Sequence, residues 1–142
     1  MSRPGVPIED PVEGLIRRCR IGGPKRQPLV DAVTGRRRPP AKDFELRAAS
    51  ADRAAERALS VNIESMLRAH GLPLDYGTIP EKFYAVRLTV GACTALTLEV
   101  RADPVDGNPC HGAIWGLFEM RERDETQYER TLDALARACA VL

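Results

Sequence analysis

The sequence predicts an α+β fold, in which a small antiparallel sheet is packed by a central helix and a C-terminal helix. Two observations support this prediction. Residues 83–101 alternate apolar and polar side chains in two successive runs, as strands with one buried face do. Residues 124–139 repeat apolar side chains at the spacing of one helix face. Hydrophobic residues make up 44% of the 142 residues, which is enough for one core, so a single domain is expected.

The N-terminal third is predicted to contain only short elements. Residues 1–11 include three prolines and are expected to be a disordered lead-in to a domain that spans residues 12–142. Residues 15–21 place apolar groups around a basic centre, which suits a strand or one helical turn. Short strands are predicted at residues 29–33 and 44–47.

Residues 50–70 are compatible with two structures. Their apolar side chains share one face of a helix, and this spacing favours a single helix that ends at the Gly-Leu-Pro of residues 71–73. The alternative makes residues 59–61 a short strand, with Asn62 capping a shorter helix that ends at Ala69.

The second half of the chain contains the most regular patterns. Residues 83–90 and 94–101 are predicted to form an antiparallel hairpin, and residues 111–116 a further strand. Asp124 is expected to begin the C-terminal helix, with Gln127 three residues further on as in a capping box. The apolar stripe of this helix consists of Tyr128, Leu132, Leu135 and Cys139.

The net charge of +1 conceals an uneven distribution. Residues 1–42 carry ten basic and four acidic side chains, a net +6, whereas residues 43–142 carry 11 basic and 16 acidic, a net −5. The basic N-terminal segment, residues 15–42, could therefore pack on the acidic body or contact an acidic partner. Nucleic-acid binding is less favoured, because residues 1–43 contain no aromatic side chain that could stack on a base.

The N-terminus lacks the apolar core of a signal peptide, and no run approaches the roughly 18 apolar residues of a membrane span. A cytoplasmic protein without membrane contact is therefore expected, with its cysteines kept as reduced, buried thiols. None of them forms a Cys-x-x-Cys pair, so no metal site is predicted. These cysteines are Cys19, Cys93, Cys110 and Cys139.

His111 is the leading candidate for a catalytic residue, because it lies where a loop enters a predicted strand. The alternative is a histidine that only hydrogen-bonds the preceding loop. Cys110 is its neighbour, and on a strand the two side chains would point to opposite faces and form no dyad. Ser60 and Asn62 are polar side chains in an apolar stretch and could bind a ligand or make local hydrogen bonds. Asn108 is a further candidate for ligand binding.

Four short segments follow one another in an order that resembles a known group. They are Leu-Ile-Arg-Arg at 15–18, Arg-Pro-Pro-Ala-Lys-Asp-Phe at 38–44, Leu-Ser-Val-Asn at 59–62 and Pro-Cys-His-Gly-Ala-Ile-Trp-Gly at 109–116. The group consists of small uncharacterised bacterial proteins. It has serines where this chain has Pro40 and Ala41. The resemblance draws attention to Arg38, Ser60 and His111, favours a strand at residues 59–61, and implies no activity.

The first functional hypothesis is a small binding or accessory protein that acts through a protein partner and needs no cofactor, because no familiar catalytic motif appears. The alternative is an enzyme whose site gathers Ser60 and His111 with three arginines as ligand-binding residues, namely Arg17, Arg18 and Arg38. A second alternative is nucleic-acid binding through the basic segment.

One form of the enzyme hypothesis is an ADP-ribosyltransferase-like protein that uses NAD. Those enzymes have an early Arg or His, a later Ser or Tyr, and a catalytic Glu. This chain has the first two in that order, but no glutamate stands out as the third. Glu99 and Glu119 are the available candidates.

Overall fold

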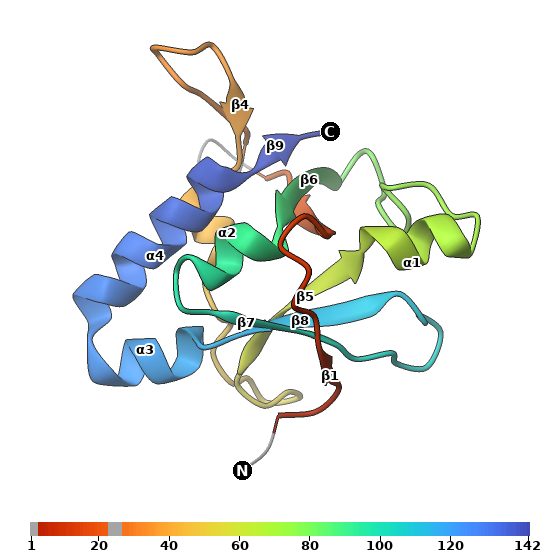
Figure 1. Cartoon of the computed structure of the whole chain (residues 1–142). Helices are drawn as coiled ribbons and strands as arrows, with labels where there is room; N and C mark the ends of the chain where they lie inside the picture. The colour runs from red at the N-terminus through yellow and green to blue at the C-terminus, as the bar shows by residue number, and fades with distance from the viewer. Residues whose placement is uncertain (1–2, 23–26) are drawn as a thin grey trace.

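A computed structural model describes residues 3–22 and 27–142 as a sheet with helices on both faces (Figure 1). Within these residues the sheet has seven antiparallel strands in the order β1-β7-β8-β5-β2-β6-β9, which confirms the α+β class. The strands are β1 (Val6–Pro7), β2 (Gly14–Arg20), β5 (Ala58–Ile63), β6 (Phe83–Thr89), β7 (Glu99–Ala102), β8 (His111–Trp115) and β9 (Ala140–Val141).

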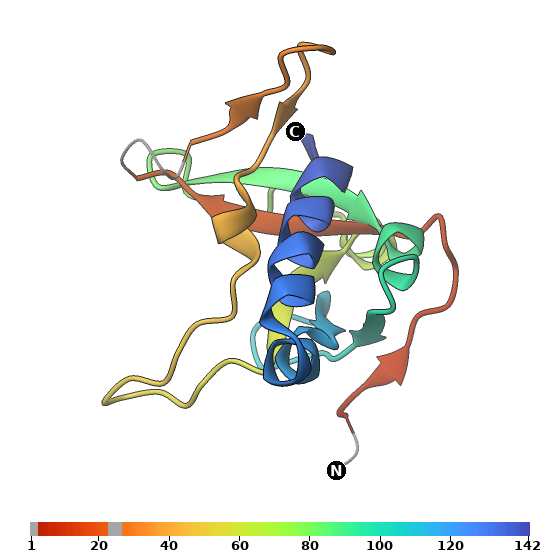
Figure 2. The ribbon, with the colours of Figure 1, turned by 90° about the vertical axis from the view of Figure 1, so that its left-hand side faces the viewer.

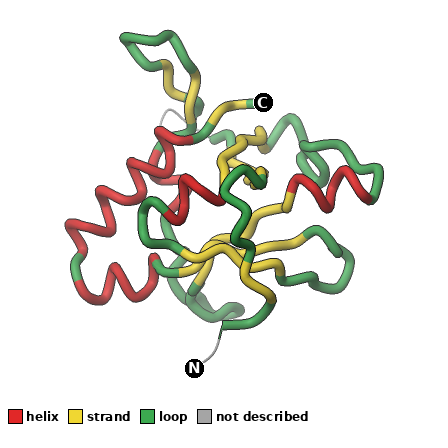
Figure 3. The backbone as a smooth tube through the Cα atoms, viewed as in Figure 1, coloured by secondary structure: helices red, strands yellow, loops and turns green. Residues whose placement is uncertain are grey.

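The helices gather mainly on one side of the strands (Figure 3). Their bounds are η1 (Ala41–Phe44, a 3₁₀ helix), α1 (Glu64–Ala69), α2 (Val90–Thr94), α3 (Leu117–Arg123) and α4 (Glu125–Ala138). A separate two-stranded ribbon, formed by β3 (Leu29–Val30) and β4 (Arg37–Arg38), extends away from the body (Figure 2).

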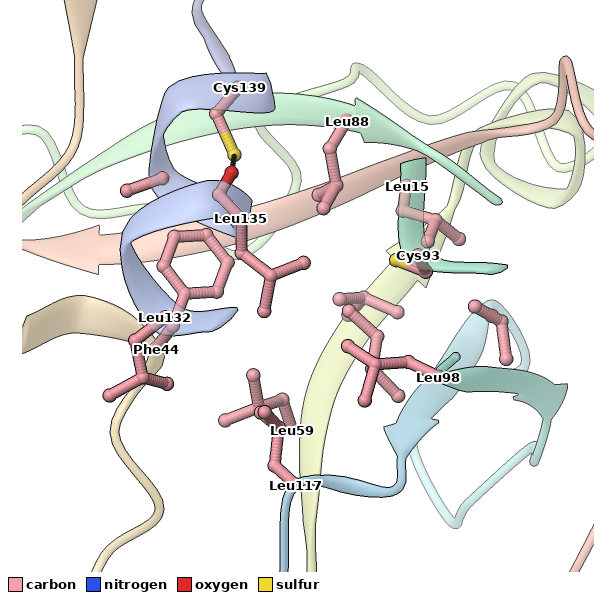
Figure 4. Packing of buried hydrophobic residues seen from close by; sticks show 14 of the residues in the cluster. Leu15, Phe44, Leu59, Leu88, Cys93, Leu98, Leu117, Leu132, Leu135 and Cys139 are labelled. Carbon is pink, nitrogen blue, oxygen red and sulfur yellow. Dashed lines mark hydrogen bonds between the residues drawn. The ribbon is translucent and has the colours of Figure 1, made fainter. Parts of the chain in front are cut away.

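The main core lies between the sheet and α4 (Figure 4). Alternate side chains of β5 point into it, and they pack in one buried cluster with Leu132 and Leu135 of α4. Asp124 begins α4 by accepting a hydrogen bond from the backbone N–H of Gln127 at 3.1 Å. The predicted C-terminal helix, its cap and its buried stripe are therefore confirmed, as is the strand predicted at residues 111–116.

The opposite face of the sheet is covered only in part. Helix α1 and the loop after it contribute Leu67, Leu72 and Tyr76 to a small second cluster over Ile16 and Cys110. The same face of β5 and β8 carries Ser60, Asn62 and His111, because strand side chains alternate between faces.

The predicted hairpin over residues 83–101 is wrong. β6 pairs with β2 and β9, β7 pairs with β1 and β8, and helix α2 lies between β6 and β7 in the chain. Residues 91–93, which separate the two predicted strands, lie within this helix, and Thr89 caps it by accepting a hydrogen bond from the N–H of Ala92. Alternation identifies the faces of a strand but not its partners.

The single helix predicted over residues 50–70 is also wrong, and the alternative is correct in its main feature. β5 is followed directly by the short helix α1. Asn62 does not cap this helix, because it lies within β5 and its side chain bonds to Asn108. Leu59 and Ile63 fit both a helical spacing and a strand alternation, so their positions could not decide between the two.

Two further elements of the N-terminal third differ from expectation, and one agrees with it. Residues 44–47 do not form a strand, because Phe44 ends helix η1. A disordered lead-in was predicted at residues 1–11, but its described part, residues 3–11, contains β1, and Arg101 donates hydrogen bonds to the carbonyls of Pro4 and Gly5. Residues 15–21 were expected to form a strand or one helical turn, and the strand is correct, because β2 lies inside the sheet between β5 and β6.

The described part of the chain contains no helix that is both long and apolar enough to cross a membrane. In the same residues, no group of His, Cys, Asp or Glu side chains is arranged to hold a metal ion. All four cysteines are unpaired and buried, as the sequence led us to expect.

Candidate functional site

Five of the predicted site residues line one pocket on the open face of the sheet. The pocket has a volume of about 170 Å³. Strands β2, β5 and β8 lie side by side at this point, and the register pairs Asn62 with Ile16 on one side and with His111 on the other. The residues of the pocket lining that were predicted are Arg18, Ser60, Asn62, Asn108 and His111. The rest of the lining consists of Ile16, Val61, Tyr76 and Gly77.

His111 makes two hydrogen bonds that fix its tautomer. Its Nδ1 lies 2.8 Å from the backbone carbonyl oxygen of Asp103, and its Nε2 lies 3.2 Å from Oγ of Ser60. A carbonyl oxygen only accepts, so Nδ1 carries the proton of the neutral ring. Nε2 therefore accepts the hydroxyl proton of Ser60. The bond to the preceding loop does exist, and it orients the ring toward Ser60.

Asn62 and Asn108 form the amide side of the pocket. Nδ2 of Asn108 donates to Oδ1 of Asn62 at 2.7 Å, and Oδ1 of Asn108 accepts from the N–H of Cys110 at 3.0 Å. Both amide oxygens are thus engaged. Within the described residues the Nδ2 group of Asn62 has no hydrogen-bond partner, so its two N–H groups are available to a ligand.

Arg18 supplies the positive charge of the pocket. Its Nη1 donates to the carbonyl of Gly77 at 2.9 Å, and its guanidinium stacks over the ring of Phe83, 5.0 Å from the centroid. These two contacts hold the side chain across the pocket wall, while the other N–H groups of the guanidinium have no bond within the described residues.

Arg17 does not line this pocket, although it was predicted to. β2 and β5 are paired only at Leu15 with Ile63 and at Ile16 with Asn62, so their ladder ends before Arg17. The guanidinium of Arg17 instead contacts backbone carbonyls. It donates to the carbonyl of Ser60 at 2.8 Å and, through Nε and Nη2, to the carbonyl of Asp43. Burial lowers the pKa of Arg17 from its ordinary value.

Arg38 is not brought to the site either. It lies in β4, on the ribbon that extends from the body, and it lines neither of the two pockets described in this section. Its Nε is buried without a hydrogen-bond partner in the described residues.

Sequence reasoning missed three contributions to the site. Tyr76 and Gly77 come from the loop after α1, and Asp103 acts through its backbone carbonyl, for which its side chain gives no signal. It also missed a larger groove next to the pocket, with a volume of about 760 Å³. The groove shares Arg18 and Ser60 with the pocket.

The cysteines are poor candidates for nucleophiles. Burial, followed by the charge of Asp43, raises the pKa of Cys19 to about 12. Burial also raises the pKa of Cys93 to about 12, and it raises the pKa of Cys110. Since the thiolate is the reactive form, these side chains are unreactive near neutral pH. Cys110 is fully buried in the second cluster, so it does not share the pocket with His111.

Comparison of this chain with protein-family models, with curated proteins and with solved structures found no significant match. The two glutamates considered for an NAD-using site both form ion pairs with Arg3. Neither Glu99 nor Glu119 lines the pocket or the groove.

Proposed function

We propose that this chain is a small enzyme that binds an anionic or polar ligand in the pocket and uses Ser60 as a nucleophile and His111 as its general base. The hydrogen bond from Ser60 Oγ to Nε2 of His111 carries this proposal, because the bond at Nδ1 leaves Nε2 as a proton acceptor. A nucleophile, a base and a group that orients the base are the three parts of an activated serine.

Acyl transfer is the reaction that these groups support best. Ser60 Oγ bonds to the carbonyl carbon of the substrate as its proton passes to Nε2 of His111. His111 then gives that proton to the leaving group, whose bond to the carbonyl carbon breaks. Water, deprotonated by His111, attacks the ester formed on Ser60, and the serine hydroxyl regains the proton as the acid leaves. No cofactor is needed for this sequence.

The surroundings of the pair suit a reaction in which negative charge develops on oxygen. Asn62 offers two N–H donors and Arg18 a guanidinium, and both line the same pocket as Ser60. Donors of this kind stabilise an oxyanion more strongly where water is partly excluded. They also favour substrates that carry a carboxylate or another anionic group close to the reacting bond.

Turnover of a panel of p-nitrophenyl esters, with neutral and with carboxylate-bearing acyl groups, tests this function. We expect His111→Ala to lower kcat/KM by about 100-fold or more, the range of general-base effects. His70→Ala is the matched control, since His70 is the other histidine of the chain and is exposed at the end of α1. Equal rates for the two variants, or no turnover by the wild-type protein, would contradict the proposal.

A second candidate function, contact with a protein partner, is favoured by the β3–β4 ribbon. Val30 and Val33 are 66% and 94% exposed, and the neighbouring Arg36 and Arg37 are exposed as well. Exposed apolar side chains beside positive charge suit an acidic partner with an apolar patch. A photo-crosslinking residue at position 33 is expected to capture one defined partner in cells. The same adducts from a crosslinker at Arg130, on α4, would contradict this.

We also propose a cytoplasmic location. Its support is the set of four unpaired cysteines, since reduced thiols persist in that compartment. Cell fractionation tests it, and recovery of the protein in an exported fraction would contradict it.

A further inference from the structure

The groove beside the Ser60 pocket carries a surplus of positive charge. It lies between β2 and the segment that connects η1 to β5. Six of its side chains are basic and three are acidic. The basic ones are Arg17, Arg18, Arg20, Lys42, Arg47 and Arg53, and the acidic ones are Asp43, Glu45 and Glu56.

Several of these basic side chains form no ion pair within the described residues. Arg47 pairs with Glu56 at 3.4 Å, and Arg17 is held by carbonyl groups. Arg20, Lys42 and Arg53 are exposed and form no ion pair in the part of the chain that the structure describes. Three cations therefore line the groove without an ion-pair partner among residues 3–22 and 27–142.

The groove and the pocket adjoin at two residues, because Arg18 and Ser60 line both of them. The hydroxyl of Ser60 bonds to His111 in the pocket, and its backbone carbonyl bonds to Arg17 of the groove. The groove, at about 760 Å³, has the size of a site for a metabolite, whereas the pocket, at about 170 Å³, holds only one small group.

We infer that the groove binds a substrate with two or more phosphate groups, whose reacting end enters the Ser60 pocket. Guanidinium groups match phosphate oxygens with paired hydrogen bonds, and a lysine adds a further point charge. A small phosphorylated molecule fits better than a nucleic acid, because the chain as a whole has a net charge of only +1. The placement of the reacting end rests on the proposed function, whereas phosphate binding in the groove does not.

Calorimetric titration with inorganic tripolyphosphate, ADP and adenosine tests the inference. We expect the first two to bind and adenosine to bind at least tenfold more weakly than ADP. In the double variant Arg20→Gln/Arg53→Gln we expect the dissociation constant for tripolyphosphate to rise about tenfold or more. We also expect added salt to weaken the binding of tripolyphosphate by this variant less than its binding by the wild-type protein. Both arginines are exposed, and circular dichroism checks that the variant is folded.

Matched variants separate this inference from the proposed chemistry. Arg130→Gln removes an exposed arginine of α4 outside the groove and is expected to leave binding unchanged. Ser60→Ala is expected to lose turnover but to keep tripolyphosphate binding. Unchanged binding in the groove double variant would overturn the inference. So would binding of a single-stranded oligothymidine tenfold tighter than tripolyphosphate, which would assign the groove to nucleic acid.

Discussion

The side chain of Arg17 donates a hydrogen bond to the backbone carbonyl of Ser60, with 2.8 Å between Nη1 and the oxygen. The bond forms just beyond the point where the ladder between β2 and β5 ends. It links the two strands through a side chain, where no further backbone pairing joins them. A residue outside the pocket thus holds the backbone of the proposed nucleophile in place.

Replacing Arg17 by methionine is expected to lower the free energy of unfolding by about 2 kcal/mol, because the carbonyls of Asp43 and Ser60 lose their partners. Urea unfolding followed by circular dichroism measures this change. Arg130→Met, on the exposed face of α4, is the control and is expected to change stability by less than about 0.5 kcal/mol. Equal stability of the two variants would show that Arg17 does not support Ser60.

Replacing Asn108 by alanine is expected to lower the free energy of unfolding by about 1–2 kcal/mol, because Oδ1 of Asn62 and the N–H of Cys110 lose their partners. Asn108→Asp keeps an oxygen that can accept from Cys110, so we expect a smaller loss for it. Thermal unfolding of both variants provides the comparison. An aspartate variant as unstable as the alanine variant would argue against the bond to Cys110.

The stability of the protein is expected to fall as the pH rises above about 9. The pKa of Cys19 and of Cys93 is about 12 in the folded protein, against an ordinary value of 9.0. The unfolded chain therefore releases thiol protons between these two values while the folded protein retains them. The contribution of these neutral thiols to the free energy of unfolding is fully present below pH 9 and is lost toward pH 12. The loss is no more than about 1.4 kcal/mol per pH unit for each thiol.

Urea unfolding at a series of pH values measures this loss, and Cys93→Ala is expected to reduce its slope. Alkylation by iodoacetamide at pH 8 provides an independent check. The native protein should react slowly, and the unfolded protein should take up four equivalents, one for each cysteine. Rapid uptake by the native protein would contradict the buried, neutral state of the thiols.

The C-terminal helix could be predicted from the sequence because its signals are local. Asp124 and Gln127 lie within one turn, and the buried stripe repeats at helical spacing. The strand partners could not be predicted in this way. β2 pairs with β6, about seventy residues further along the chain, and nothing in the alternation of either strand names the other.

The residues of the candidate site could be picked out from the sequence only in part, because their positions in space depend on strand pairing. Ser60 and Asn62 stood out as polar groups in an apolar stretch, and His111 stood out where a loop enters a strand. The pairing of β5 with β8 brings the three together. Arg17 and Arg18 were equivalent candidates in the sequence. They differ in the structure because neighbouring residues on a strand point to opposite faces, so that only Arg18 reaches the pocket.

Covalent labelling with a fluorophosphonate, read by intact mass and peptide mapping, tests the central claim most directly, because it needs no knowledge of the natural substrate. We expect one adduct, on Ser60, in the wild-type protein and in His70→Ala. The adduct should be absent in Ser60→Ala and should form at least 100-fold more slowly in His111→Ala. No adduct on Ser60, or an equal rate in His111→Ala, would contradict the assignment of Ser60 and His111 as nucleophile and base.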